Sequence, residues 1–208
     1  MRIIKEYDER RNEILDTAER LFYMKGYDKC TVNDILKGVG IAKGTFYHYF
    51  KSKEEVLDEI VLRYKDIVVS RANEILKMNN ISQEEKLLRA FMAMRITSQI
   101  DDNMLDDIHK VENALLHQKV LNQMVTTMAP ILVKIIEEGI ANKVWNCRYP
   151  LEYMQIFLAS SLSLTDEGIF ELDADSQMKV MAAIISMLEK MLDVPEDSFM
   201  QLFMQNYG

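Results

Sequence analysis

The amino-acid sequence predicts an all-α protein, and three observations carry that prediction. Apolar residues recur at spacings of three and four along most of the chain, which is the period of a helix that buries one face. Only seven Gly and three Pro stand among 208 residues, which leaves little room for the turns of a sheet. No segment alternates apolar and polar residues for long. With 49% apolar and 28% charged residues, the composition is that of a globular protein with a sizeable core.

The first helix is expected from about residue 8 to residue 25. One face of this segment is apolar and the opposite face is charged, as in a helix that covers a core. Gly26 follows in the position that glycine favours after a helix. The apolar stripe consists of Ile14, Leu15, Ala18, Leu21 and Phe22.

The stretch from residue 31 to residue 53 predicts two short helices joined by a glycine turn. Thr31 and Asp34 have the spacing of a capping box, in which each side chain binds the other residue's amide. Gly38 and Gly40 flank the end of the first short helix, where we expect both to supply the positive φ of a sharp turn. The second short helix is expected from about Ala42 to Phe50.

The outward side of this second helix has an unusual composition. Phe46 and Phe50 are four residues apart and are expected to face inward. The outward residues are then small, basic, hydroxylated or aromatic, and no acid stands between Asp34 and Glu54. Short polar side chains near a helix N-terminus can reach base edges, and Lys and Tyr can reach phosphate oxygens. An ordinary surface helix pair is the alternative interpretation of the same pattern. The outward residues are Lys43, Gly44, Thr45, Tyr47 and His48.

These residues carry a resemblance to a known family. The segments TVNDI, GIAKGTFYHYF and KSKEEVL, which begin at residues 31, 40 and 51, resemble the DNA-binding segment of the tetracycline-repressor (TetR) family. The preceding AERLF and GY, at residues 18 and 26, fit the same family. The resemblance covers about residues 8 to 60 without a gap, and beyond it the chain matches only in length and helical character.

The resemblance implies a division into a DNA-binding domain, residues 1–52, and a helical regulatory and dimerisation domain, residues 53–208. It also implies that Gly44 and Thr45 approach base edges, with Lys43 and His48 sharing that task. Ala42 stands where family members often have a capping Ser, so the helix start is weaker here. Contacts to the DNA backbone are implied for Thr31, Lys43, Tyr47, His48 and Lys53.

The charge is divided in a way that favours a local DNA contact. The whole chain has a net charge of −8, but residues 1–53 hold eleven Lys and Arg against eight Asp and Glu. The remaining residues hold 14 Lys and Arg against 25 Asp and Glu. Attraction to phosphates depends on the local patch, so the acidic remainder is expected to stay away from the duplex.

Beyond residue 52 the pattern predicts further helices at about 52–78, 82–98, 102–116, 118–142, 150–164 and 175–192, and a short one after Pro195. Ser52 with Glu55 and Ser82 with Glu85 are expected to cap two of them. Family members dimerise through their last two long helices. The expected dimer contacts are therefore Met154, Leu158, Ser161, Leu162, Met181, Ile185 and Leu188. Both helices are apolar enough to be the core of one chain instead, and that alternative stays open.

Fifteen methionines, several on the middle helices, suit either a cavity that accepts varied ligands or simple core filling. The resemblance favours a cavity, because family members bind effectors there. Arg95 stands among apolar residues and is expected to pair with an acid of the protein in preference to a ligand carboxylate. The expected ligand contacts are Tyr64, Phe91, Met92, Arg95, Leu105, Ile108, Met124 and Met128.

No enzyme motif is found, and no cofactor is expected. His109 and His117 lie two helical turns apart, so we interpret them as solvated or capping residues rather than metal ligands. Cys30 and Cys147 fit no metal or redox motif. The sequence shows neither a secretory signal nor a membrane-spanning run, and we expect a cytoplasmic protein.

The leading hypothesis is a homodimeric transcriptional repressor that a small apolar ligand releases from a palindromic operator. The alternative is a DNA-tethered interaction protein whose helical body recruits a protein partner instead of sensing a ligand.

Overall fold

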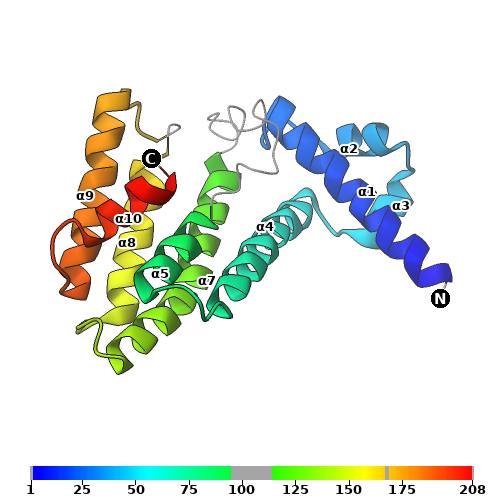
Figure 1. Ribbon diagram of the computed structural model, residues 1–208. Helices are drawn as coiled ribbons and strands as arrows, with labels where there is room; N and C mark the ends of the chain where they lie inside the picture. The colour runs from blue at the N-terminus through cyan, green and yellow to red at the C-terminus, as the bar shows by residue number, and fades with distance from the viewer. Residues whose placement is uncertain (1, 95–113, 167–168, 208) are drawn as a thin grey trace. The chain divides into compact units, whose positions relative to one another are not determined.

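The computed structural model describes residues 2–94, 114–166 and 169–207 (Figure 1). These residues form helices joined by turns, without a strand, which confirms the predicted all-α class. The helices are α1 (Arg2–Lys25), α2 (Val32–Val39), α3 (Lys43–Tyr49), α4 (Lys53–Leu76), α5 (Gln83–Met92), α7 (Ala114–Ala141), α8 (Pro150–Leu164), α9 (Ala174–Leu192) and α10 (Ser198–Tyr207). No helix in these ranges is both long enough and apolar enough to cross a membrane.

The helices form two compact units. The described residues up to Tyr64, together with 114–120, make the head unit, and those from Lys65 to 94 and from Leu121 onward make the body unit. The first half of α4 belongs to the head unit because Val56 and Leu57 are fully buried. A functional division between residues 52 and 53 stays a prediction.

The head unit is built around the predicted stripe of α1. Ile14, Leu15, Ala18 and Phe22 have no exposed surface, and Ile35 of α2 joins them. Each such large apolar side chain contributes about 1.5–3 kcal/mol when removed from water. The Thr31–Asp34 capping box is also present, as predicted.

The two glycines near the turn have different roles. Gly40 ends α2 with a φ of 76°, the left-handed conformation that was predicted. Gly38 does not adopt it, and that prediction was wrong. Gly38 is helical, and a Cβ there would lie 2.7 Å from Cγ2 of Thr17. It therefore allows α2 to pack closely on α1.

The helices after residue 94 differ from the prediction mainly at the start of α7. Residues 102–113 of the helix predicted at 102–116 lie outside the described residues. Its last residues belong to α7, which begins at Ala114 and not near Gln118. No Gly or Pro stands between them to end a helix there. α7 continues through Pro130, and Pro150 occupies the first turn of α8.

The sole tryptophan joins α7 to the last helix. Trp145 follows α7 and is 4% exposed. A Cβ on Gly139 would overlap its indole ring, so glycine lets the ring lie flat on the helix. On its other side Trp145 packs against Phe199 of α10, with ring centroids 6.3 Å apart. Phe199 is 1% exposed, which shows that the first turn of α10 packs onto the body unit.

Candidate DNA-reading face and apolar body pocket

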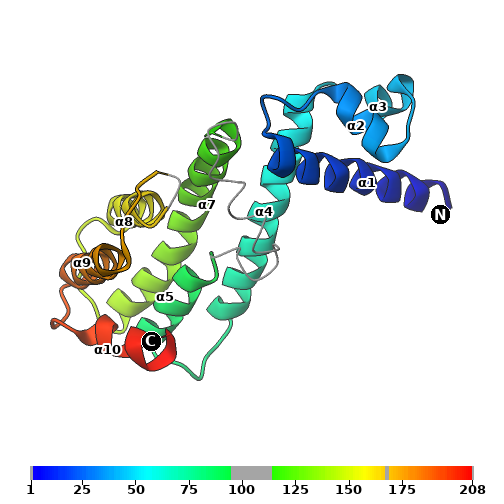
Figure 2. The ribbon, with the colours of Figure 1, turned by 90° about the horizontal axis from the view of Figure 1, so that it is seen from above.

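α3 presents one apolar side to the head core and one polar side to solvent. Phe46 and Phe50 are 0% and 1% exposed, as predicted. The reading face, defined as Lys43, Gly44, Thr45, Tyr47 and His48, lies on the other side, with Thr45 half-buried and the rest exposed. Figure 2 shows α3 beside α2, in the arrangement of a helix-turn-helix.

The start of α3 is open. Ala42 precedes the helix and makes no side-chain cap, as the sequence indicated. A Cβ on Gly44 would meet no atom within 4 Å. The glycine is therefore not needed for packing inside this chain. It leaves the backbone accessible to a ligand that comes close, such as the edge of a base.

An aromatic contact that was not predicted from the sequence supports α3. Tyr7 of α1 stacks on Tyr49 with centroids 4.6 Å apart and meets His48 edge-on at 5.8 Å. This contact orients the His48 ring at the end of the reading face. A signal was present, because Tyr7 precedes Ile14 by seven residues and so lies on the same side of α1 as the buried stripe.

Thr31 and its surroundings form a charged cap. Its hydroxyl donates to Oδ2 of Asp34 at 2.7 Å and accepts from the Asp34 amide at 3.2 Å. Lys25 donates to Oδ1 of Asp34 at 2.8 Å. These hydrogen bonds, that of Lys25 first, hold the pKa of Asp34 well below its ordinary value. The Thr31 side chain is thus oriented at the exposed start of α2.

Lys53 has an internal role that the sequence did not show. Its Nζ donates to the carbonyl oxygens of Tyr27 at 2.6 Å and Cys30 at 2.9 Å. It also lies 4.0 Å from the centroid of the Tyr27 ring. An ammonium group has three donors, so two are used to close the turn between α1 and α2. The main role of Lys53 in the structure is therefore to stabilise this turn within the head unit.

A second lysine, also missed, ties α7 to the start of α4. Nζ of Lys119 lies 2.5 Å from Oδ1 of Asp58 and 3.2 Å from Oε1 of Glu54. The hydrogen bond to Asp58 is the largest of the causes that raise the pKa of Lys119.

The residues predicted to bind a ligand are not gathered in one described pocket. The Tyr64 hydroxyl, in the head unit, contacts Glu19 and lies 2.5 Å from the hydroxyl of Tyr23. Burial raises the pKa of all three groups. Met124 and Met128 are buried on α7, and Met92 is half-buried. Arg95, Leu105 and Ile108 lie outside the described residues.

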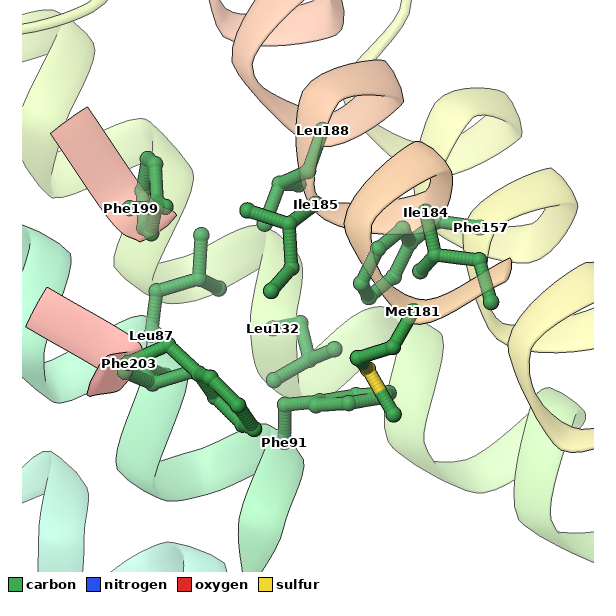
Figure 3. A pocket seen from close by; sticks show the side chains of 11 residues that line it. Leu87, Phe91, Leu132, Phe157, Met181, Ile184, Ile185, Leu188, Phe199 and Phe203 are labelled. Carbon is green, nitrogen blue, oxygen red and sulfur yellow. The ribbon is translucent and has the colours of Figure 1, made fainter. Parts of the chain in front are cut away.

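An apolar pocket lies in the body unit instead (Figure 3). Five helices surround a void of about 20 Å³, and every described side chain that lines it is apolar. Among the described residues of the predicted ligand set, Phe91 alone lines it. The lining residues are Leu87, Leu88, Phe91, Leu132, Phe157, Met181, Ile184, Ile185, Leu188, Phe199 and Phe203.

Five of the seven predicted dimer contacts are buried within the described chain, and the location of the interface stays a prediction. Met154 and Leu158 are 0% exposed, and Ser161 is 1% exposed and donates to the Phe157 carbonyl oxygen at 2.6 Å. Met181, Ile185 and Leu188 line the apolar pocket, and Leu162 is half-buried. Side chains without exposed surface cannot contact a second subunit. Both helices are apolar on two sides, and the sequence did not show which side the chain covers itself.

The opposite side of α8 and α9 is open. These helices lie side by side, as Figure 2 shows. The groove face, defined as Tyr153, Ala183, Ser186, Met187, Lys190 and Met191, lines an open groove of about 540 Å³. Ile156, one turn from Tyr153, is 52% exposed.

Comparison with known proteins supports the helix-turn-helix assignment and also finds a match for the body of the chain. Residues 14–60 match the family model described as bacterial regulatory proteins, tetR family. Residues 95–187 match the model of the tetracyclin repressor-like C-terminal domain. The chain belongs to the TetR family.

Among the TetR-family relatives is the HTH-type transcriptional repressor KstR2 of Mycobacterium tuberculosis (strain CDC 1551 / Oshkosh), 38% identical over 88 residues, which are 38% of this chain and 44% of KstR2. The chain thus spans less than half the length of the curated relatives it matches first. Salmonella enterica GusR shares the fold with a TM-score of 0.65 at 18% identity, over 89% of this chain and 96% of GusR. RolR, solved with the ligand resorcinol, has a TM-score of 0.63 at 14% identity. The match covers 96% of this chain and 95% of RolR.

Proposed function

We propose that this TetR-family protein is a homodimeric transcriptional repressor that reads a palindromic operator with α3. The observation that carries the proposal is the reading face. It is exposed, free of acids, open at Gly44, and supported from below by buried Phe46 and by Tyr7. These are the properties of a helix that enters a major groove, where small side chains reach bases.

The proposed contacts divide into two kinds. Gly44 and Thr45 approach base edges, with Lys43 and His48 beside them. Thr31, Lys43, Tyr47, His48 and Lys53 contact the DNA backbone. For Lys53 the two bonds to carbonyl oxygens leave one donor direction for a phosphate, so its larger contribution is to hold the turn below the reading face.

The second copy is proposed to bind at the groove face. Tyr153, Met187 and Met191 offer apolar surface there, and Ile156 extends it. An α-helical pair with an open apolar side can bury it against the same pair of a second chain, related by a two-fold axis. A two-fold dimer places its reading helices one DNA turn apart or a multiple of it, which requires a nearly palindromic operator.

Release by a small apolar ligand completes the proposal. The support is the pocket of the body unit, whose described lining is apolar, together with the ligand-bound state of the structural neighbour RolR. A ligand that lowers operator affinity must itself bind less tightly to the DNA-bound protein, by the same factor. The coupling is typically about 1–3 kcal/mol.

The test is the salt dependence of binding to operator fragments selected from genomic DNA. Lys43→Ala should weaken binding and reduce the slope of log K against log salt by about one, because one phosphate contact is lost. Lys134→Ala is the matched control, since it removes the same charge from an exposed position of α7 in the body unit. Equal effects of the two substitutions would refute the assignment of α3.

A further inference from the structure

The described lining of the void in the body pocket disfavours water. A buried water needs two to four polar partners, and the described lining side chains offer none (Figure 3). At about 20 Å³ the void has room for one water-sized group, and an apolar group suits this lining better than a water does. An apolar group that filled it would gain contact with the surrounding side chains at no cost in hydrogen bonds.

The last helix forms one wall of this pocket and is anchored at its first turn. Glu189 of α9 is 3% exposed, and its carboxylate accepts from three backbone amides. The distances are 3.1 Å to Asp197, 2.9 Å to Phe199 and 3.3 Å to Met200. A carboxylate at a helix N-terminus satisfies amides that lack a partner within the helix and interacts favourably with the helix dipole.

The two phenylalanines of α10 that line the pocket differ in exposure. Phe199 is 1% exposed and lies in the anchored turn against Trp145. Phe203, one turn later, is half-buried. Figure 3 shows its ring beside Leu87 and Phe91. The Phe203 ring therefore stands at the solvent side of the pocket, beyond the turn that Glu189 holds.

We propose that this pocket binds an unsubstituted hydrocarbon group, an aromatic ring or a short alkyl group, that takes the place of the Phe203 ring. The void alone is too small for a ring, and the outward rotation of Phe203 supplies the missing space. Glu189 keeps the first turn of α10 in place during the exchange. This inference specifies the class of ligand for the proposed function. It rests on that function only where it concerns the effect of the ligand on DNA binding.

The lining chemistry sets the specificity. A hydroxyl or carboxylate in the pocket would lose its hydrogen bonds to water and find no partner. Met181 is flexible and its sulfur is favourable beside an aromatic ring. The site should thus accept toluene and reject phenol, which has nearly the same shape.

The experiment measures binding of toluene and phenol to the full chain by ligand-observed NMR. The native protein should bind toluene saturably and phenol at least tenfold more weakly. Phe203→Ala should bind toluene at least tenfold more tightly, because no ring has to leave. Met204→Ala is the matched control, since Met204 is the next residue of α10 and is 60% exposed. It should bind toluene as the native protein does.

Trp145 provides a second measurement, because it is the only tryptophan and touches α10. Its emission should change little on toluene binding, since the anchored turn stays in place. Absence of saturable toluene binding by the native protein, equal toluene affinity of Phe203→Ala and Met204→Ala, or equal affinity for phenol overturns the proposal. If Phe203→Ala does not fold by circular dichroism, Phe203→Leu replaces it with the same expected direction.

A measurement of operator affinity tests the proposed function independently of the ligand site. Toluene binding at the pocket without any change in operator affinity refutes control by ligands of this class and leaves the site standing. Failure of the native protein to bind any genomic fragment refutes the repressor proposal, again without affecting the site.

Discussion

α3 and the pair α8–α9 differ in how clearly their sequences show which side is inward. α3 has two phenylalanines on one side and polar residues on the other, and its predicted orientation is confirmed. α8 and α9 have apolar residues on both sides, and five of the seven residues assigned to a partner are buried within the chain. An apolar stripe shows the buried side only when the opposite side is polar.

The largest expected effect contrasts the two sides of α8 and α9. Ser161→Arg places a charge where the side chain is 1% exposed, so the free energy of unfolding should fall by more than about 3 kcal/mol. Ala183→Arg, on the exposed groove face, should leave it within about 0.5 kcal/mol. Sedimentation should then show a folded monomer for Ala183→Arg and a dimer for the native protein. A dimeric Ala183→Arg protein would move the proposed interface elsewhere.

Two neighbouring residues of α3 make the same contrast in the head unit. Phe46→Ala should lower the free energy of unfolding by about 3–5 kcal/mol, because it removes a fully buried ring. Tyr47→Ala, at a side chain 48% exposed, should leave stability nearly unchanged. Operator affinity should nevertheless fall for Tyr47→Ala. Denaturant unfolding and fluorescence anisotropy measure the two quantities, and a Tyr47→Ala protein that binds DNA normally would contradict the reading face.

Gly44 allows a smaller but more specific test, since stability and function should change in opposite directions. Gly44→Ala should stabilise α3 by about 0.5–1 kcal/mol, because alanine favours a helix and its Cβ meets nothing within 4 Å. Operator affinity should fall, because the added methyl group separates the backbone from a base. A stabilised protein with unchanged affinity would show that nothing approaches Gly44.

The smallest expected effect is the acid sensitivity of the α2 cap. The pKa of Asp34 is depressed in the folded state by Lys25 and Thr31. Its stabilising contribution is therefore present above the unfolded pKa of about 4 and is lost as the pH falls below that value. Asp34→Asn should show less loss of stability between neutral and acid pH than the native protein does. If the melting temperatures of the two proteins fall in parallel as the pH is lowered, Asp34 does not contribute to the acid sensitivity.

Local patterns account for what the sequence predicted correctly. The capping box of Thr31 and Asp34, the left-handed Gly40 and the burial of Phe46 each depend on residues within one or two helical turns. Lys53 shows the limit of such patterns. The resemblance implied a contact with the DNA backbone for Lys53, but its ammonium group also donates to carbonyl oxygens 23 and 26 residues away. No local pattern contains that information.

The sequence alone determined the helical class, the order of the helices and the orientation of α3, because hydrophobic period and caps act over short distances. Only the tertiary structure decided which side of α8 and α9 is covered, that Tyr7 supports α3, and that α10 closes a pocket with Phe203. These features arise when helices far apart in the chain compete to cover the same apolar surface. Which of them succeeds depends on shape and packing, since the hydrophobic effect has no direction of its own.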